Sequence, residues 1–477
     1  MAQQLEVRPT VDRKVYEREA DCSAPRVRCV TWAICAAVWC LTLQIDSGPV
    51  TAQSREEKVR NDRQKFGIDG IWIYNDFTRA VEQAKRSGQP ILAVMRCVPC
   101  VDCVKLDDDV MEDHPQLQEL LRRFVRVRLI STNGLDLRLF QFDTDQSFNV
   151  MIMNADGTIY GRYGTRSHHD RWQDDVSVDG LAAALQQALE LHQGYPGNQQ
   201  QLAAKQGDKP LYATPEQFPT LKERYKSKLS ETGAIVPSCI HCHQIGDAIR
   251  SHHFSESGNL PEEVLFPNPH PKALGLILDP KQGTTVLNVD RDSVAAGAGF
   301  QVGDRLIAMN GQPLISIADV QWVLHHVPAE GGKVAVEVSR DDLAKNLTLT
   351  LRPRWREKDD IAWRASTWEL RRRTLGGLYL LAATAEEKKR AGIAADRPAL
   401  RVQHVGQYAP HDVAKRAGFR VDDLIVQFDE KDFERETDLI RYVLRHPTRP
   451  PQFDVATRRG QETLTLKLPN TAGAREP

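Results

Sequence analysis

Three cysteines stand close together in the first third of the chain, at Cys97, Cys100 and Cys103. Each neighbouring pair has the C-x-x-C spacing, which lets a second thiol reach the first after one helical turn and resolve a mixed disulfide. A thiolate is stabilised at a helix N-terminus, where its pKa falls. The cluster therefore predicts thiol–disulfide exchange. Zinc is the alternative, although three cysteines would need a fourth ligand for a tetrahedral site.

A second cluster, Cys239-Ile240-His241-Cys242-His243, has the C-x-x-C-H spacing that attaches c-type haem. In such a site Cys239 and Cys242 form thioether bonds to the porphyrin, and His243 is the proximal ligand of the iron. The sequence therefore predicts covalent haem c, with a sixth ligand from His252, His253 or His270. Two alternatives stay open. They are a zinc site, which uses both cysteines and two histidines of this region, and a second dithiol.

The N-terminal part of the chain predicts export. Residues 30–45 form a long apolar run, which Arg26 and Arg28 precede and small residues up to Ala52 follow. This order of basic, apolar and small residues is typical of a secretory signal cleaved after Ala52. The run is shorter than the roughly 20 residues that cross a bilayer, and an uncleaved membrane anchor is the alternative. Either way, we expect a periplasmic or other extracytoplasmic protein.

Composition excludes several classes of function. The 63 Lys and Arg residues balance 64 Asp and Glu residues, for a formal net charge of −1, so we expect no nucleic-acid partner. We expect membrane contact only through an uncleaved anchor. Apolar residues make up 41% and charged residues 27% of the 477 residues, which is enough to build several ordinary cores.

The first cysteine cluster follows a strongly apolar segment, residues 91–95, which we predict to be a buried strand that leads into a helix. The surrounding segments alternate between helical and strand periods. We expect helices at residues 77–85, 117–121 and 181–191, and strands at residues 124–130, 149–153 and 158–160. Asp156-Gly157 marks a hairpin turn between the last two strands. This pattern predicts a small mixed sheet covered by helices.

This region resembles the thioredoxin fold, specifically domains of the thioredoxin-7 type, through residues 88–95, the three cysteines and residues 105–113. Cys97-Val98-Pro99-Cys100 looks like the familiar C-G-P-C motif. In the thioredoxin-7 type, however, the nucleophile lies ten residues after a proline, and counting from Pro90 gives Cys100. The resemblance thus favours Cys100 as nucleophile, Cys103 as resolving cysteine and Cys97 as an auxiliary thiol. The family's cis-proline is missing near Ser147-Phe148, which leaves substrate binding open.

The C-terminal half contains a repeat. Residues 295–304 (AAGAGFQVGD) recur as residues 414–423 (AKRAGFRVDD). The first copy, with Asn310-Gly311 after it, resembles a PDZ domain of the bacterial protease-associated type. That resemblance implies that Leu274, Gly275 and Leu276 bind the terminal carboxylate of a peptide, which adds as a strand beside Ile277. A β-module that serves only packing is the alternative.

The second copy departs from the PDZ pattern. Gly303 and Gly311 of the first copy correspond to Asp422 and Glu430, and we expect a degenerate PDZ-like domain. Overall the sequence predicts a multidomain α+β protein with a thioredoxin-like α/β domain, a small helical C-x-x-C-H segment and two PDZ-like β-rich domains. The expected boundaries are a signal peptide at 1–52, a linker at 53–66, the thioredoxin-like domain at 67–193, a linker at 194–210, the C-x-x-C-H segment at 211–268, PDZ domain 1 at 269–353 and PDZ-like domain 2 at 354–470.

The combination resembles the bacterial thioredoxin-like and PDZ domain-containing (seleno)protein group. It implies an exported thiol–disulfide oxidoreductase or electron-transfer protein that uses a C-x-x-C centre and a redox partner protein. Its PDZ domains would dock protein clients or peptide C-termini. The alternative is a non-enzymatic PDZ scaffold with a structural thioredoxin fold and structural zinc.

Overall fold

The computed structural model describes residues 54–67, 70–98, 115–146, 148–168, 171–230, 234–446, 448 and 450–472. The predicted signal peptide, Cys100 and Cys103 lie outside these residues. Within the described ranges, no helix is both long and apolar enough to cross a membrane.

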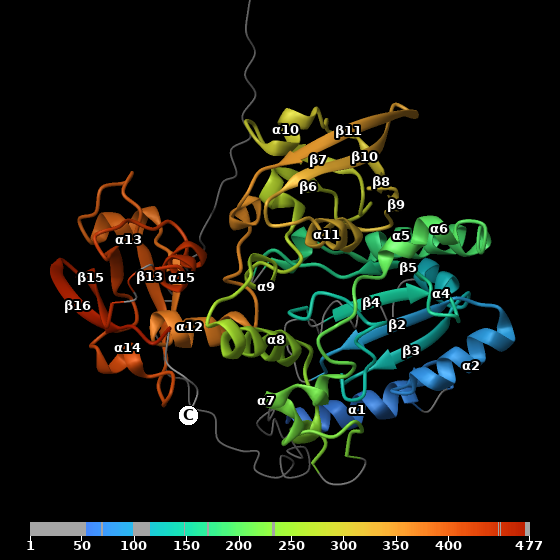
Figure 1. Cartoon of the computed structure of the whole chain (residues 1–477), viewed down its shortest axis with the longest axis horizontal. Helices are drawn as coiled ribbons and strands as arrows, with labels where there is room; N and C mark the ends of the chain where they lie inside the picture. Colours follow the sequence, from blue (N-terminus) through green and yellow to red (C-terminus); the bar gives the residue numbers. More distant parts are fainter. Residues whose placement is uncertain are drawn as a thin grey trace, which may run out of the picture. The chain divides into compact units, whose positions relative to one another are not determined.

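The first domain is built on a five-stranded sheet with the strand order β1-β3-β2-β4-β5 (Figure 1). Its strands are β1 (Ile73–Tyr74), β2 (Ile91–Arg96), β3 (Val125–Leu129), β4 (Phe148–Met153) and β5 (Ile159–Tyr163). β1, β2 and β3 are parallel, whereas β4 and β5 are antiparallel to their neighbours. The carboxyl ends of the three parallel strands therefore share one edge of the sheet, and the chain reaches Cys97 at that edge.

Helices cover both faces of this sheet because side chains alternate along each strand. On β2, Ile91, Ala93 and Met95 pack with Ala80 and Ala84 of α2 (Phe77–Ser87). The intervening residues of β2 pack with apolar side chains of α4 (Pro115–Leu121) and α5 (Val178–Gln193). Both faces are buried, which explains why the strand is a continuous apolar run.

The two segments predicted to be linkers are packed instead. Residues Arg55–Gly67 form α1, and its Asp62 accepts hydrogen bonds from Nε of the buried Arg128 at 3.1 Å through both carboxylate oxygens. The 194–210 segment contains α6 (Gln199–Leu202) and Lys205, whose Nζ lies 2.9 Å from Asp319 with both side chains 1% exposed. Polar composition misleads here because these charges are buried against partners far away in the sequence.

The region that carries the C-x-x-C-H motif is helical, as predicted. It contains α7 (Pro219–Lys222), α8 (Cys242–Ser257) and α9 (Glu262–Leu265). α8 begins within the motif, so His243 lies in its first turn.

The next domain contains a four-stranded antiparallel sheet, a two-stranded sheet and two helices around one apolar core. Its elements are β6 (Leu276–Leu278), β7 (Val286–Val289), α10 (Val294–Ala298), β8 (Arg305–Met309), β9 (Gln312–Pro313), α11 (Ile317–His325), β10 (Gly332–Arg340) and β11 (Leu343–Leu351). α11 is buried along most of its length because this core and the first domain both pack against it.

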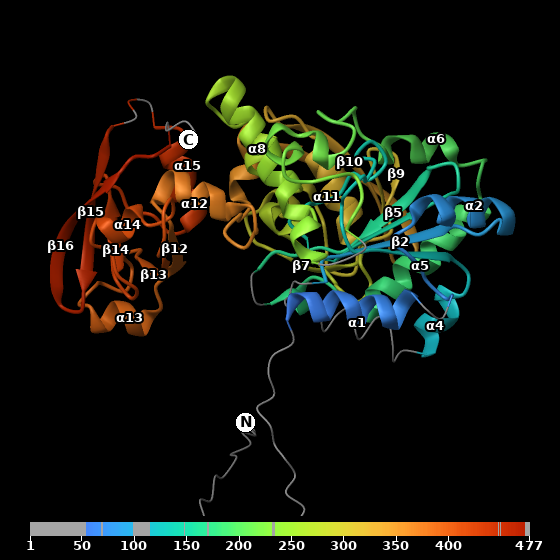
Figure 2. The same cartoon turned by 90° about the horizontal axis from the view of Figure 1, so that it is seen from below.

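The last domain is an antiparallel sheet with the order β12-β13-β14-β15-β16 and helices beside it (Figures 1 and 2). Its elements are α12 (Thr367–Leu375), β12 (Leu378–Ala382), α13 (Ala385–Arg390), β13 (Leu400–Val405), α14 (Val413–Arg416), β14 (Leu424–Phe428), α15 (Glu436–Leu444), β15 (Gln452–Arg459) and β16 (Glu462–Pro469). With the two preceding domains, it makes the multidomain α+β architecture that the sequence predicts.

The sequence repeat is also a repeat of contacts. Arg340 Nε donates to Asp304 at 2.6 Å, and Arg340 Nη2 donates to a glycine carbonyl at 2.8 Å. In the last domain Arg459 makes the same two contacts, to Asp423 at 2.7 Å and to the corresponding glycine carbonyl at 2.8 Å. Arg340 therefore links the turn before β8 to the β10–β11 hairpin, and Arg459 links the turn before β14 to the β15–β16 hairpin.

The degenerate turn of the second repeat gives a stability prediction. Asp429 and Glu430 have φ values of 52° and 60°, and Asn310 and Gly311 hold the same left-handed turn in the first repeat. Glutamate meets a steric cost in this conformation that glycine avoids. We expect Glu430→Gly to raise the free energy of unfolding by about 0.5–1 kcal/mol, measured by thermal denaturation. The control Glu434→Gly, outside that turn, should give no gain.

Candidate functional site

Cys97 lies at the carboxyl edge of the parallel strands, directly after β2. It is partly buried. Cys100 and Cys103 follow in a segment outside the described residues, so the predicted roles of these two thiols stay predictions. Of the first cluster, the structure thus describes only Cys97, the thiol that the favoured thioredoxin-7 register makes auxiliary.

The two cysteine clusters meet in space. The Sγ atom of Cys97 lies 3.2 Å from Nδ1 of His241, which stands inside the C-x-x-C-H motif. The sequence analysis missed this contact, because it treated the clusters as separate sites. No local pattern signals it, since 144 positions separate the two residues.

Backbone contacts hold the C-x-x-C-H segment at the edge of the sheet. The loop after β3 supplies them. The amide of Thr132 donates to the carbonyl of Ile240 at 3.0 Å, and the amide of Ile240 donates to Asn133 Oδ1 at 2.8 Å. The amide of His241 donates to Gln244 Oε1 at 2.8 Å. These contacts fix the imidazole of His241 beside the thiol of Cys97.

The imidazole of His241 is uncharged at neutral pH. Burial lowers its pKa to about 4, and the neighbouring His243 adds to this effect. The two rings are stacked, with centroids 5.8 Å apart and planes 4° apart. In a neutral imidazole one nitrogen carries a proton and the other does not, so His241 can accept a hydrogen bond from the thiol of Cys97 or donate one to its thiolate. With its pKa lowered to about 4, it is a weak base.

A cavity of about 210 Å³ opens beside this pair. Cys97, Cys242 and His243 line it, together with residues from the chain just before the last domain. Among these, Trp363 and Arg364 form part of the wall, and the guanidinium of Arg364 lies 4.6 Å from the ring of Trp363. Thiols from both clusters therefore face one small space.

A buried ion cluster supports that wall. Arg364 Nη1 lies 2.7 Å from Asp143 and 3.3 Å from Asp145, and Arg364 Nη2 donates to the carbonyl of Pro267 at 2.6 Å. The backbone amide of Ser366 donates to Asp145 at 2.8 Å. Burial raises the pKa of the Asp143 carboxyl. The cluster joins the loop before β4 to the start of the last domain.

The described geometry does not fit haem c. Cys239 is 2% exposed and packs in an apolar cluster with Val59, Val98 and Ile130. It is not among the described residues that line the cavity of Cys242 and His243, whereas haem attachment needs both thiols at one porphyrin edge. The cavity is also smaller than the roughly 300 Å³ at which ordinary cofactor pockets begin. Haem c at these residues stays a prediction.

The other predicted ligands are also placed. His252 and His253 contact each other on α8, with ring centroids 5.7 Å apart, and His270 Nε2 lies 3.4 Å from Asp175. In the part of the chain that the structure describes, no group of three or more His, Cys, Asp or Glu side chains is arranged to hold a metal ion.

The three residues expected to bind a peptide carboxylate lie together at the start of β6. Leu274 ends a short helical turn, Gly275 has a φ of 73°, and Leu276 begins the strand. All three are buried, and Leu274 and Leu276 are 2% and 0% exposed. The loop thus has the local form that the resemblance implies, but not an exposed surface.

In the last domain, a buried ion pair occupies the edge of β12, the strand that corresponds to β6. Glu436 of α15 accepts the backbone N–H of Leu380 in β12 at 2.7 Å and lies 2.6 Å from Arg371 of α12. Both charged side chains are at most 2% exposed. A peptide that adds as a strand beside β12 would need the N–H groups of that edge. The ion pair gives a physical reason for the expected degeneracy.

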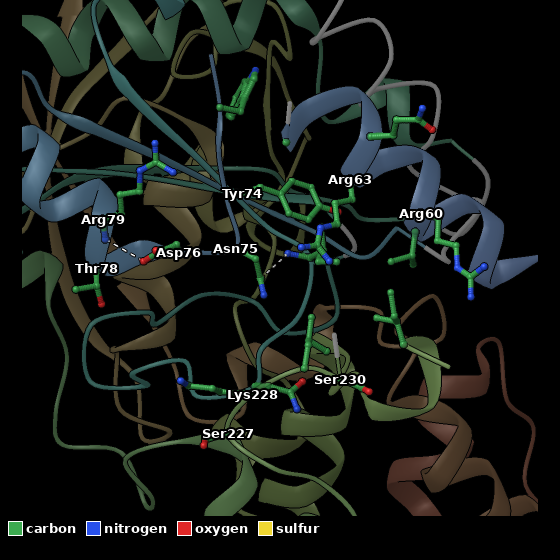
Figure 3. A pocket seen from close by; sticks show the side chains of 18 of the residues that line it. Arg60, Arg63, Tyr74, Asn75, Asp76, Thr78, Arg79, Ser227, Lys228 and Ser230 are labelled. Carbon is green, nitrogen blue, oxygen red and sulfur yellow. Dashed lines mark hydrogen bonds between the residues drawn. The ribbon is translucent and has the colours of Figure 1, made fainter. Parts of the chain in front are cut away.

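A larger cavity, of about 1250 Å³, lies on the other side of the sheet edge (Figure 3). Arg60 and Arg63 of α1 line it on one side and Lys228 lines it on the other, and Arg79 also lines it (Figure 3). The carboxylate of Asp76 is used as the cap of α2, where it accepts the amide of Arg79 at 3.0 Å. The cavity is therefore positively charged. The sequence analysis missed it because its basic residues come from separate segments.

Two family models match parts of this chain. A model described as thioredoxin-like matches residues 72–155, and a PDZ domain model matches residues 269–351. Probable periplasmic serine endoproteases, DegP-like, are similar over part of their length. The protein from Pseudomonas savastanoi pv. phaseolicola is 35% identical over 112 residues, 24% of this chain and 23% of that protein. The one from Pseudomonas fluorescens is 31% identical over 112 residues, with the same coverage.

The chain spans less than a quarter of the length of these curated relatives. The first matched region covers β1 to β4 of the five-stranded sheet, and the second covers the domain of β6 to β11. This multidomain α+β protein therefore contains a thioredoxin-like domain, residues 72–155, and a PDZ domain, residues 269–351.

Proposed function

We propose that this protein is an extracytoplasmic thiol–disulfide oxidoreductase whose PDZ domain docks protein partners. One observation carries the redox part: the thiol of Cys97 lies 3.2 Å from the imidazole of His241, at the active edge of a thioredoxin-like sheet. A hydrogen bond from a positioned neutral imidazole favours the thiolate, which is the nucleophilic form of cysteine. The predicted signal peptide and the periplasmic relatives support the location.

The proposed reaction reduces a client disulfide. A thiol of the first cluster loses its proton to a base, and the thiolate attacks one sulfur of the client. The client's other sulfur leaves as a thiolate and takes up a proton. The partner thiol then attacks the mixed disulfide, which releases the client as a dithiol and leaves a Cys–Cys disulfide in the protein. Two electrons pass to the client, and a dithiol redox partner must restore the reduced protein.

Two pairs of cysteines could perform these steps. The resemblance to thioredoxin-7 domains favours Cys100 as nucleophile and Cys103 as resolving thiol, with Cys97 auxiliary. The contact with His241 favours Cys97 as nucleophile and Cys100 as its C-x-x-C partner. We propose the second assignment as the one that the described geometry supports, and the experiment below separates them.

Insulin reduction by the full-length protein, with dithiothreitol as the reductant, tests both assignments. Cys97→Ser should abolish activity if Cys97 attacks, whereas Cys103→Ser should abolish it if Cys103 resolves. Cys100→Ser should abolish it in both cases. Cys239→Ser is the matched control, because this buried thiol lies in an apolar cluster. Wild-type rates in all three variants of the first cluster would instead support the non-enzymatic scaffold.

Haem c at Cys239, Cys242 and His243 is a separate proposal about the second cluster. Its support is the C-x-x-C-H spacing alone. The protein should be expressed with export and haem maturation, and its covalent mass and Soret absorbance should then be measured. A mass that corresponds to the bare chain contradicts the haem proposal without affecting the thiol assignment.

A further inference from the structure

The thioredoxin-like domain covers the elements between which a PDZ domain takes its peptide. In this fold the peptide adds beside the strand that follows the carboxylate loop and lies against the long helix, here β6 and α11. Residues 161–168 and 171–180, from β5 to the start of α5, contact α11 and the chain just before and just after β6; we call them the covering segment. The contacts occur at three places.

The first place is α11. The backbone amide of Arg162 donates to Asp319 Oδ1 at 3.1 Å, and the guanidinium of Arg162 lies 3.6 Å from the ring centroid of Trp322. Further along the helix, the hydroxyl of Thr165 donates to Gln321 Oε1 at 2.5 Å. The covering segment therefore contacts α11 from Asp319 to Trp322, which is slightly less than one helical turn.

The second place is the carboxylate loop. Asp175 is fully buried, and its Oδ1 lies 2.6 Å from Nζ of Lys272, two residues before Leu274. Its Oδ2 accepts the hydroxyl of Ser167 at 2.8 Å, and His270 Nε2 lies 3.4 Å from Oδ1. A carboxylate of this chain is thus held by a cation beside the loop that is expected to take a peptide's terminal carboxylate.

The third place is the far end of β6. The hydroxyl of Ser177 donates to the carbonyl of Pro280 at 2.9 Å. Gly180 comes so near that a Cβ atom on it would stand 2.1 Å from the same carbonyl oxygen. Such an approach is possible only for glycine. The covering segment therefore contacts the chain on both sides of β6, at Lys272 before it and at Pro280 after it.

We propose that the thioredoxin-like domain is the built-in ligand of the PDZ domain, with Asp175 in the role of a peptide's terminal carboxylate. A free C-terminal peptide binds at β6 only when the covering segment leaves. The inference rests on the proposed peptide docking but not on the thiol chemistry.

Two opening variants of the full-length protein test this proposal. Gly180→Ala places a methyl group against Pro280, and Asp175→Ala removes the internal carboxylate. Gly297→Ala and Asp174→Ala are the matched controls, because the Cβ position of Gly297 has no neighbour within 4 Å and Asp174 is half exposed. Circular dichroism checks that each variant folds.

The first readout is hydrogen exchange of the β6 amides. We expect it to rise about tenfold or more in both opening variants and to stay unchanged in the controls. The second readout is binding of a fluorescein-labelled peptide pool, randomised in sequence and ending in valine with a free carboxylate. Opening should tighten this binding about tenfold, since the competent fraction of the protein increases. The C-terminally amidated pool should not bind.

The possible outcomes distinguish the built-in contact from the peptide docking. Unchanged exchange in both opening variants overturns the built-in ligand, and so does wild-type peptide binding as tight as that of Gly180→Ala. Faster exchange without peptide binding in any variant supports the built-in contact, and it contradicts only the peptide docking of the proposed function.

Discussion

Replacing Arg364 by leucine is expected to lower the free energy of unfolding by about 3–5 kcal/mol, because it leaves buried carboxylates without their counter-charge. The side chain of Arg364 is 1% exposed, and those of Asp143 and Asp145 are 8% and 1% exposed. Burial opposes ionisation of Asp145, but the charges of Arg364 and Arg250 outweigh it and lower the pKa of this carboxyl. Chemical denaturation followed by tryptophan fluorescence measures the loss.

Two further variants distinguish the loss of the Arg364 counter-charge from a non-specific loss of stability. Arg354→Leu removes a 64% exposed arginine that is paired with Glu357, so we expect a change below about 1 kcal/mol. The triple variant Arg364→Leu, Asp143→Asn, Asp145→Asn removes Arg364 together with the two carboxylates that it pairs with, and it should recover at least half of the loss. An Arg364→Leu protein that unfolds no more readily than Arg354→Leu would show that the cluster does not hold the wall of the cavity.

The local elements of the thioredoxin-like domain could be predicted from the sequence, because each has a pattern with one physical cause. Residues 91–95 read as an apolar run since both faces of β2 are covered, and the predicted strand agrees with β2 at Ile91–Arg96. The repeat was visible for a similar reason. The glycine and the aspartate that Arg340 or Arg459 contacts recur at a fixed offset, as Gly299 and Asp304 and then as Gly418 and Asp423.

Contacts between distant segments could not be predicted in this way. Asp62 and Lys205 lie in segments whose composition is typical of linkers, yet each is buried against a charge that is more than 60 positions away. The same holds for Arg364 and its aspartates. A charged residue predicts exposure unless its partner is known, and a single sequence does not reveal the partner.

The contacts of the candidate site also join distant segments and could not be predicted from the sequence. The residue types and spacing of the two cysteine clusters predicted thiol–disulfide exchange and haem attachment. Nothing in either cluster predicted that Ile240 would form hydrogen bonds with Thr132 and Asn133. That tie brings His241 to Cys97 and changes the preferred nucleophile. For the choice of nucleophile, the position of His241 therefore carries more weight than the spacing of the thiols.

Replacing His241 by phenylalanine is expected to slow alkylation of Cys97 about tenfold or more at neutral pH, because an aromatic ring remains but no longer donates a hydrogen bond to the Cys97 thiolate. The reaction should be followed with iodoacetamide in a Cys100→Ser, Cys103→Ser background, in which Cys97 is the one remaining thiol of its cluster. Mass spectrometry of the peptide that contains Cys97 measures the rate. Since burial lowers the pKa of His241 to about 4, its charge does not change near neutral pH. The ratio of the two rates should therefore stay constant from about pH 6 to 8.

His253→Phe is the matched control, since this residue lies on α8 and its ring contacts His252 rather than Cys97. It should leave the alkylation rate unchanged. A rate ratio near one for His241→Phe would mean that the 3.2 Å contact is only packing. The nucleophile would then be Cys100, as the thioredoxin-7 register predicts, because only the histidine contact favours Cys97 over it.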